Sequence, residues 1–137
     1  MTKKTFVPLL AVILLAVGSL SAQISNAVKA DIPFDFTAGN ITMPAGEYQI
    51  ANSGHPGTLL IGSYGSSGEF VGAHAAQASG RAESTKLVFH RYGDRYFLYQ
   101  VWVEGEDRGS EVPLTKFEKE LSASKERPAS VIVLARK

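Results

Sequence analysis

The stretch KLVFHRYGDRYFLYQVW, residues 86–102, decides the fold. Gly93 and Asp94 separate two runs rich in Val, Phe, Tyr and Trp, residue types that favour strands. Because glycine takes positive φ at no steric cost in a two-residue connection, the pattern predicts a β-hairpin. We expect it near the middle of the fold, with Phe89, Leu98 and Trp102 in the core. The turn also predicts a register, with Arg91 opposite Tyr96, Phe89 opposite Leu98, Leu87 opposite Gln100 and Thr85 opposite Trp102 on one face. On the other face it predicts Val88 opposite Tyr99, His90 opposite Phe97 and Lys86 opposite Val101.

Short apolar runs bounded by Gly, Pro, Asn and Ser continue on both sides of the hairpin. This rhythm predicts further antiparallel strands at residues 32–36, 41–43, 47–51, 58–62 and 69–79. In the first of these Ile32, Phe34 and Phe36 occupy alternate positions, so we expect three large apolar side chains on one face. Pro33 lacks an N–H for a ladder and should lie at an edge or a bulge.

One short helix is predicted near the C-terminus. Thr115 and Glu118 form a capping box, in which the hydroxyl accepts from the Glu118 amide and the carboxylate accepts from the Thr115 amide. Leu114, Phe117 and Leu121 would mark the apolar face of this helix, and Glu118 would lie on the polar face. A helix this short must pack on a sheet to be stable.

Two more segments complete the fold prediction. Residues 130–135, SVIVLA, are apolar on both faces of a strand, which is typical of a central strand. Residues 104–111, EGEDRGSE, are expected to form a solvated connection. The sequence therefore predicts an all-β fold with one short helix, formed by a single domain of residues 28–137. Its architecture would be a small antiparallel β-barrel or a two-sheet β-sandwich of about seven strands.

Residues 1–27 have the pattern of a secretory signal peptide, in which Lys3 and Lys4 precede an apolar run and small residues follow it. The apolar run at residues 6–17 is shorter than the roughly 20 residues that span a membrane, so we expect no stable membrane span after signal removal. Cleavage after Ala22 or after Ala27 fits the pattern. We expect a bacterial protein that is exported to the periplasm or to the extracellular medium.

The composition limits the classes of partner and of stabilisation. Of the fourteen Lys and Arg residues, Lys3 and Lys4 belong to the expected signal peptide, so twelve remain against thirteen Asp and Glu. A mature chain near −1 without clustered positive charge is not expected to bind nucleic acid. The chain has no cysteine, so the exported domain must be stabilised by a buried apolar core and not by disulfides.

The polar residues form no recognisable catalytic or metal-binding motif. His55, His74 and His90 are too widely spaced for a metal-ligand motif, and no serine lies in a G-x-S-x-G sequence. We expect structural roles for the three histidines, with His90 facing Phe97 across the hairpin. The sequence thus predicts no catalytic residue, no metal and no cofactor, and a hydrolase-type enzyme is the least favoured function.

A cavity is the remaining candidate site. A closed barrel of this size can hold one small apolar ligand, and five aromatic side chains could line its interior: Tyr48, Phe70, Phe89, Tyr99 and Trp102. A filled core is the favoured alternative. We expect an exported, non-catalytic β domain that acts as a binding or interaction module. Its partner would be a protein or a small apolar ligand. A lipocalin-like carrier of a small apolar ligand is the alternative.

The segments IPFDFTAGNITMPAGEYQI, KLVFHRYGDRYFLYQVW and LTKFEKELSAS resemble a group of small exported proteins of acidobacterial type. In that group an apolar strand ending in FDF leads to a turn and a PAGxY piece, and an RYGDxYFL hairpin leads to VW. The resemblance covers most of the mature chain. It implies export and a β-rich fold, and it implies nothing about chemistry.

Overall fold

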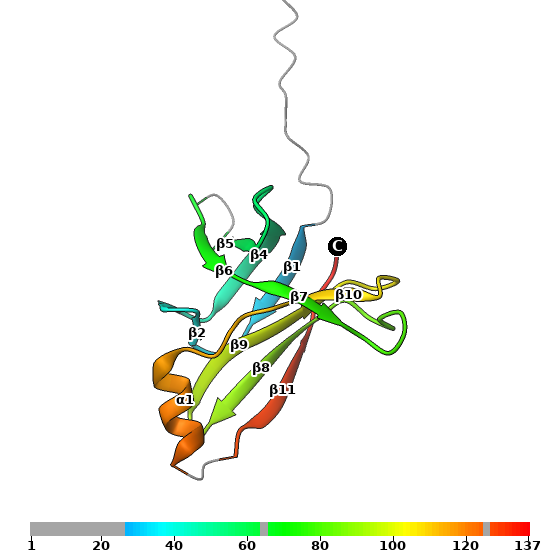
Figure 1. Cartoon of the computed structure of the whole chain (residues 1–137). Coiled ribbons are helices and arrows are strands. Elements are labelled where there is room, and N and C mark those ends of the chain that lie inside the picture. Colours follow the sequence, from blue (N-terminus) through cyan, green and yellow to red (C-terminus); the bar gives the residue numbers. More distant parts are fainter. Residues whose placement is uncertain (1–26, 64–65, 125–126) are drawn as a thin grey trace, which may run out of the picture.

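The computed structural model describes residues 27–63, 66–124 and 127–137, so the predicted signal peptide lies almost entirely outside the described residues. The described chain forms eleven strands and one helix (Figure 1). In chain order these are β1 (Val28–Ile32), β2 (Phe36–Ala38), β3 (Ile41–Met43), β4 (Gly46–Asn52), β5 (Thr58–Ser63), β6 (Glu69–Gly72), β7 (His74–Gln77), β8 (Lys86–Tyr92), β9 (Arg95–Trp102), β10 (Arg108–Glu111), α1 (Lys116–Ala123) and β11 (Ala129–Leu134).

The strands form two sheets that are not closed into a barrel, so the fold is an all-β sandwich with one short helix. The smaller sheet has the order β1-β4-β5-β6, with every neighbouring pair antiparallel. The larger sheet has the order β11-β8-β9-β10-β7. The β2–β3 hairpin joins it through a short parallel pairing, in which Thr37 lies opposite Phe97. The predicted fold class is confirmed, and the sandwich is the correct alternative.

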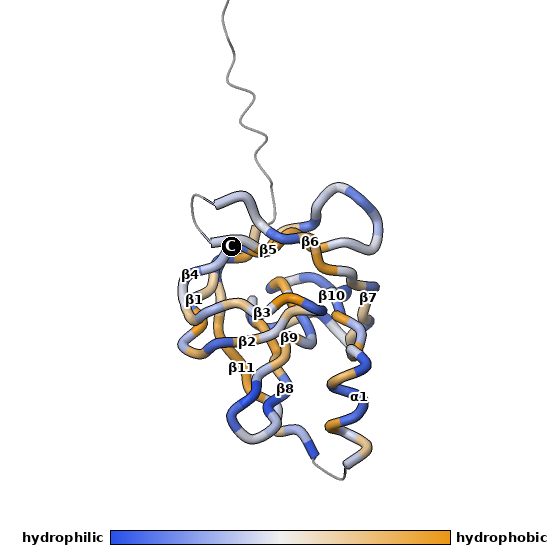
Figure 2. The backbone as a smooth tube through the Cα atoms, turned by 90° about the vertical axis from the view of Figure 1, so that its left-hand side faces the viewer, coloured by the Kyte–Doolittle hydropathy of each residue, from blue (hydrophilic) through white to orange (hydrophobic). Residues whose placement is uncertain are grey.

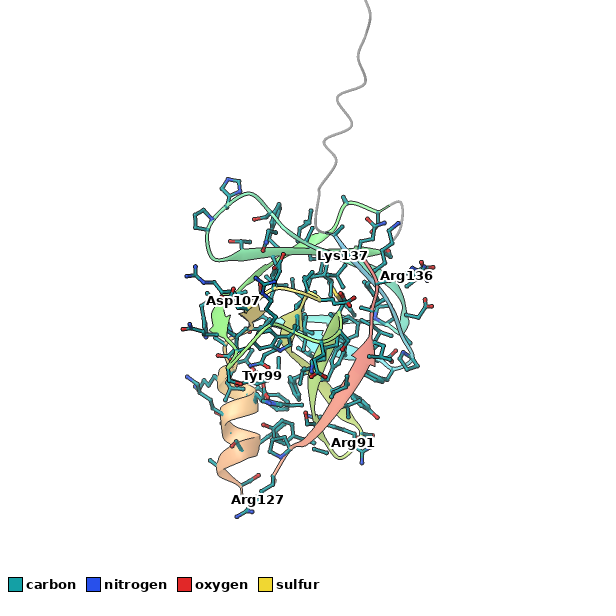
Figure 3. All side chains as sticks on the ribbon, turned by 90° about the vertical axis from the view of Figure 1, so that its right-hand side faces the viewer. Arg91, Tyr99, Asp107, Arg127, Arg136 and Lys137 are labelled. Atoms are coloured by element: carbon teal, nitrogen blue, oxygen red, sulfur yellow. The ribbon has the colours of Figure 1, made fainter. Side chains whose placement is uncertain are left out.

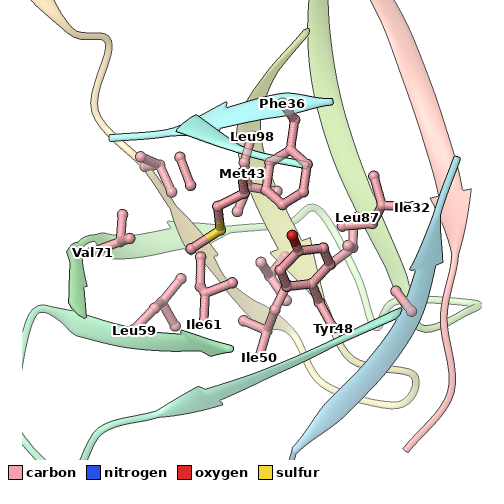
Figure 4. Close-up of a cluster of buried hydrophobic side chains, with 14 of the residues drawn as sticks. Ile32, Phe36, Met43, Tyr48, Ile50, Leu59, Ile61, Val71, Leu87 and Leu98 are labelled. Atoms are coloured by element: carbon pink, nitrogen blue, oxygen red, sulfur yellow. The ribbon is translucent and has the colours of Figure 1, made fainter. Parts of the chain in front are cut away.

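Apolar side chains from both sheets fill the interior (Figure 4). Alternate residues of β1, which are Val28, Ala30 and Ile32, point inward, because successive side chains of a strand point to opposite faces. The largest fully buried side chains are Phe36, Phe89, Ile50, Ile61, Leu87 and Val28. The predicted core residues of the hairpin, Phe89, Leu98 and Trp102, are all buried.

The central hairpin has the predicted turn but not the whole predicted register. Arg91 pairs with Tyr96 and Phe89 with Leu98, as expected. The register then shifts, so Leu87 lies opposite Val101 and not Gln100, and Trp102 lies opposite Lys86 and not Thr85. The cause is a β-bulge, because Val88 pairs with Gln100 and Tyr99 is left as an extra residue.

Two predicted strands are interrupted. The segment 69–79 does not form one strand, because the chain leaves the smaller sheet after β6 and enters the larger sheet as β7. Ala73 lies at the crossing, where its N–H donates to the carbonyl of Gly57 at 2.9 Å. The segment 32–36 breaks at Pro33, between β1 and β2, although Ile32 and Phe36 still point into the core.

The two remaining differences between the predicted and the observed strands concern the larger sheet. The segment 104–111 is not only a solvated connection, because its second half forms β10 between β7 and β9. The last strand, β11, is an edge strand and not a central one. Its outward side chains Ile132 and Leu134 are 54% and 71% exposed. Apolarity on both faces therefore does not indicate burial here.

Candidate functional site

The β-bulge places two successive polar side chains on the outer face of the larger sheet, the face turned away from the smaller sheet. Leu98 and Val101 point into the core, whereas Tyr99 and Gln100 between them point outward, Tyr99 against the His90 ring and Gln100 toward Glu111 of β10. Gln100 Nε2 donates to Glu111 Oε1 at 2.8 Å. A regular strand would direct one of these two side chains inward. The bulge therefore builds the cluster.

Two further residues extend this cluster across the sheet. His74 lies directly opposite Glu111 in the β7–β10 register, and its Nε2 is 2.7 Å from Glu111 Oε2. Trp102 Nε1 donates to Gln100 Oε1 at 3.1 Å. Gly109 lies against the Trp102 ring, and a Cβ there would come within 2.7 Å of ring carbon Cε3. The Trp102 ring therefore leaves no room for a side chain at position 109.

These contacts change the acidity of two residues. Burial raises the pKa of Glu111, but hydrogen bonds from Gln100, Tyr99 and His74 outweigh it, so the pKa lies below its ordinary value. The hydrogen bond to Glu111 is also the largest cause that raises the pKa of Tyr99, and burial adds to it. Glu111 therefore remains an anion to lower pH than an isolated glutamate, and Tyr99 remains neutral to higher pH than an isolated tyrosine.

A second cluster lies where α1 packs on the sheet. Thr115 caps the helix as predicted, because its Oγ1 accepts from the Glu118 amide at 3.2 Å. The second half of the predicted capping box is wrong, because the Glu118 carboxylate turns to the sheet and is buried. His90 Nδ1 lies 2.8 Å from Glu118 Oε1, and the Tyr92 hydroxyl donates to the same oxygen at 3.3 Å. Glu118 is thus the buried anchor of α1.

The second cluster changes the pKa of its tyrosine, Tyr92, strongly. Burial, followed by the charge and the hydrogen bond of Glu118, raises the pKa of Tyr92 to about 12. The Tyr99 ring stacks on the His90 ring with centroids 4.0 Å apart and connects the two clusters. Figure 3 labels Tyr99, which lies near α1 in that view. We call the whole set the outer-face network: His74, His90, Tyr92, Tyr99, Gln100, Trp102, Glu111 and Glu118.

The network contains two imidazole–carboxylate pairs, an arrangement that can hold or transfer a proton. Within the described residues, the hydrogen bonds do not link either imidazole to a serine or threonine hydroxyl. The parts of the chain that the structure describes also hold no group of three or more potential metal ligands. The His74–Glu111 pair links neighbouring strands, and the His90–Glu118 pair links the sheet to α1. His90 lies opposite Phe97 in the hairpin, as predicted.

A groove of about 690 Å³ lies beside α1, lined by parts of the segment 35–42, by the hairpin residues 94–97 and by the start of the helix. We call it the α1 groove. Phe117 of the helix is 46% exposed, and the Arg95 guanidinium lies 5.0 Å from the centre of its ring. Asp94, Lys116 and Glu120 add charges to the lining.

A second hollow, of about 450 Å³, is lined by both sheets at the end of the sandwich where β6 crosses to β7. We call it the inter-sheet pocket. Val28, Ile50, Leu59 and Val101 supply apolar lining from the core. Arg108 contributes a cation to the same lining.

The structure does not bring the five predicted lining residues together. Tyr48 and Phe89 are buried in the core, and the Tyr48 hydroxyl donates to the Pro44 carbonyl at 2.6 Å. Phe70 is 63% exposed on β6. Tyr99 and Trp102 belong to the outer-face network. None of the five lines either hollow among the described residues.

Sequence reasoning missed the residues that the site depends on most. The sequence predicts a solvated turn for Glu111 and a polar helix face for Glu118, but both accept hydrogen bonds from residues distant in sequence. The period-two signal in the hairpin could not reveal these partners.

The described residues contain no helix long and apolar enough to cross a membrane. The chain matches no protein-family model, and it has no significant match among the curated proteins or the solved structures.

Proposed function

We propose that the mature chain is an exported, non-catalytic β domain that acts as a binding module and receives a segment of a partner protein in the α1 groove. The observation that carries this proposal is the half-exposed aromatic ring of Phe117 in a groove of about 690 Å³. Sites that bind ligands are typically concave and mostly apolar, with a few polar groups that orient the ligand. Exposed aromatic rings are frequent binding anchors.

The charges of the groove support a partner with basic and apolar side chains. Three carboxylates line the groove against two cations, Arg95 and Lys116, and Arg95 lies over the Phe117 ring; the carboxylates are those of Asp35, Asp94 and Glu120. A cation on the partner would meet complementary charge at this rim, and an apolar side chain would cover Phe117. We therefore favour a short extended segment of a protein over nucleic acid.

A peptide library displayed on phage tests the proposal. Peptides enriched on the folded domain should bind about tenfold more weakly to Phe117→Ser, because the aromatic anchor is lost. They should bind unchanged to Phe70→Ser, a matched exposed aromatic on β6 outside the groove. Fluorescence polarisation gives both affinities. Enriched peptides that bind Phe117→Ser as well as the wild type would contradict the groove, and so would no enrichment at all.

The proposal of export rests on the signal-peptide pattern and on the resemblance to exported acidobacterial proteins. We propose that the mature protein acts in the periplasm or outside the cell. Intact mass measurement of the protein secreted or released from the periplasm should find a chain that begins at Gln23 or at Val28. A full-length chain that stays in the cytoplasm would contradict export.

A second candidate function is a carrier of a small apolar ligand, which the inter-sheet pocket favours. Its volume of about 450 Å³ and its lining by Val28, Ile50 and Leu59 suit such a ligand. An environment-sensitive apolar dye should bind the wild type, and Ala75→Phe, which fills the pocket, should reduce binding by about tenfold. Equal dye binding by both proteins would end this candidate.

A further inference from the structure

The strand β11 offers an unprotected edge of the larger sheet. One side of β11 pairs with β8 at six successive positions, from Ala129 opposite Arg91 to Leu134 opposite Lys86. Along residues 129–134 its other side pairs with no strand of the described chain, although β1 comes close to β11. Only beyond the strand does Arg136 hydrogen-bond to Lys29. Figure 3 shows β11 running from the end near Arg127 to the end near Arg136.

Edge strands of soluble proteins normally carry a device that prevents pairing, such as an inward charge, a proline, a bulge or a short length. The six residues ASVIVL of β11 contain neither charge nor proline, and the β8–β11 register has no shift. Figure 2 colours this strand as largely hydrophobic. Two of the four exposed large apolar side chains of the described residues, Ile132 and Leu134, belong to it. These features are typical of a strand that accepts another strand.

We propose that β11 pairs antiparallel with β11 of a second copy of this chain, about a two-fold axis at Val131. Residues directly opposite each other in an antiparallel pair point to the same side of the sheet. A two-fold axis through one residue therefore keeps the inner faces of both copies on the same side. The two larger sheets become one continuous sheet across the dimer.

The sequence of β11 is self-complementary in this register. Val131 lies opposite the same residue of the partner, Ser130 lies opposite Ile132 and Ala129 lies opposite Val133. Ile132 and Val133 therefore each meet a small side chain, and Val131 meets its own copy at the axis, so these pairs fit without crowding. Leu134 lies beyond the paired residues, opposite Pro128 of the partner. Because the strand is uncharged, two copies meet without like-charge repulsion. The pairing also ends before Arg136, whose backbone is bonded to Lys29.

A single engineered cysteine tests the register. The chain has no cysteine of its own, so Val131→Cys introduces the only thiols. Opposite Cα atoms in an antiparallel pair lie about 4.5–5.5 Å apart, within reach of a disulfide. Mild oxidation should therefore convert most of Val131→Cys to a covalent dimer on a non-reducing gel. Phe70→Cys, an exposed position on β6, should stay mostly monomeric, and equal cross-linking of both variants would overturn the proposal.

Charge swaps test the interface without a cross-link and at an exposed position that folding tolerates. Sedimentation velocity from about 1 μM to about 1 mM should show a concentration-dependent dimer of the wild type. Ile132→Lys and Ile132→Glu should each weaken it by about tenfold or more, because the two like charges lie diagonally across the pair, within reach of each other, and an equimolar mixture should dimerise again. A wild type that stays monomeric throughout would overturn the proposal. So would a dimer that Ile132→Lys weakens but Val131→Cys does not cross-link, because that result indicates face-to-face contact. Neither test involves the α1 groove.

Discussion

Glu118 carries its charge into the protein, where 4% of the residue is exposed. A buried carboxylate is tolerated only when it is paired and hydrogen-bonded, and here His90 and Tyr92 of β8 provide both. The sequence predicts the cap at Thr115 but not the direction of this carboxylate. A capping box is a local signal, whereas the imidazole lies 28 positions earlier in the chain. The role of the Glu118 carboxylate therefore depends on His90, a partner that only the folded chain brings close.

Removing this carboxylate should destabilise the protein. Glu118→Ala leaves His90 without its partner and releases the anchor of α1, so we expect a loss of about 3 kcal/mol of unfolding free energy, measured by urea denaturation. The matched control is Glu120→Ala, an exposed position on the same helix, which should change stability by less than about 0.5 kcal/mol. Equal losses in both variants would show that Glu118 does not anchor the helix.

Tyr92 should make stability fall at alkaline pH. Its pKa is about 12 in the folded state and 10.0 when unperturbed, so the folded state retains the phenolic proton longer. This contribution is complete below pH 10 and is lost as the pH rises from about 10 to about 12. Tyr92→Phe should remove that part of the alkaline loss and cost about 1 kcal/mol at neutral pH through the missing hydrogen bond. The measurement is the unfolding free energy of the wild type and of Tyr92→Phe between pH 8 and pH 12, with Tyr96→Phe as the control. If the unfolding free energy of Tyr92→Phe falls with pH as steeply as that of the wild type, the prediction is wrong.

At the scale of the element, the sequence predicts which segments are strands better than how they pair. The turn at Gly93 and Asp94 places the hairpin correctly, and the alternation of apolar residues identifies its core side. The bulge at Tyr99 is invisible in the pattern, because Tyr99 and Gln100 suit a strand equally well. The crossing at Ala73 is also hidden, since it depends on a hydrogen bond to Gly57 and not on local preference. The edge position of β11 follows from the topology alone.

The strand β10 depends on close contact with β9, and Gly109 permits it. A Cβ at position 109 would lie 2.7 Å from the Trp102 ring and 2.8 Å from the Val101 carbonyl. Gly109→Ala should therefore cost about 1–3 kcal/mol through forced displacement. Gly72→Ala is the matched control in β6, where a new Cβ meets nothing within 4 Å. Chemical denaturation monitored by Trp102 fluorescence gives both values, and a neutral Gly109→Ala would contradict the tight packing.

At the scale of the molecule, one core joins both sheets. The Phe89 ring from the larger sheet is fully buried and packs edge-on against Phe36 and Phe34 of the segment that follows β1. The all-β class could be predicted from short alternating apolar runs between turn residues, and the apolar interior because a domain without cysteine must bury such a core. The candidate site could not be predicted to the same degree. The α1 groove and the inter-sheet pocket each combine segments that are far apart in the sequence.

A shared core predicts a single unfolding transition. Phe89→Ala should lower the unfolding free energy by about 3–5 kcal/mol, because it leaves a cavity where both sheets meet. Circular dichroism, which reports both sheets, and fluorescence of Trp102, which reports the larger sheet, should give coincident transitions in wild type and variant. Phe70→Ala, an exposed control, should leave stability nearly unchanged. Separate transitions by the two probes would contradict one cooperative unit.

The hydrogen bonds between Lys29 and Arg136, 2.7 and 2.9 Å long, join the first strand to the last residues of the chain. This seam joins an edge strand of the smaller sheet to the end of an edge strand of the larger sheet, and its two partners are separated by nearly the whole described chain. Closing so long a loop has a large entropic cost. The seam should therefore form late in folding, after each sheet has formed its own strand pairs.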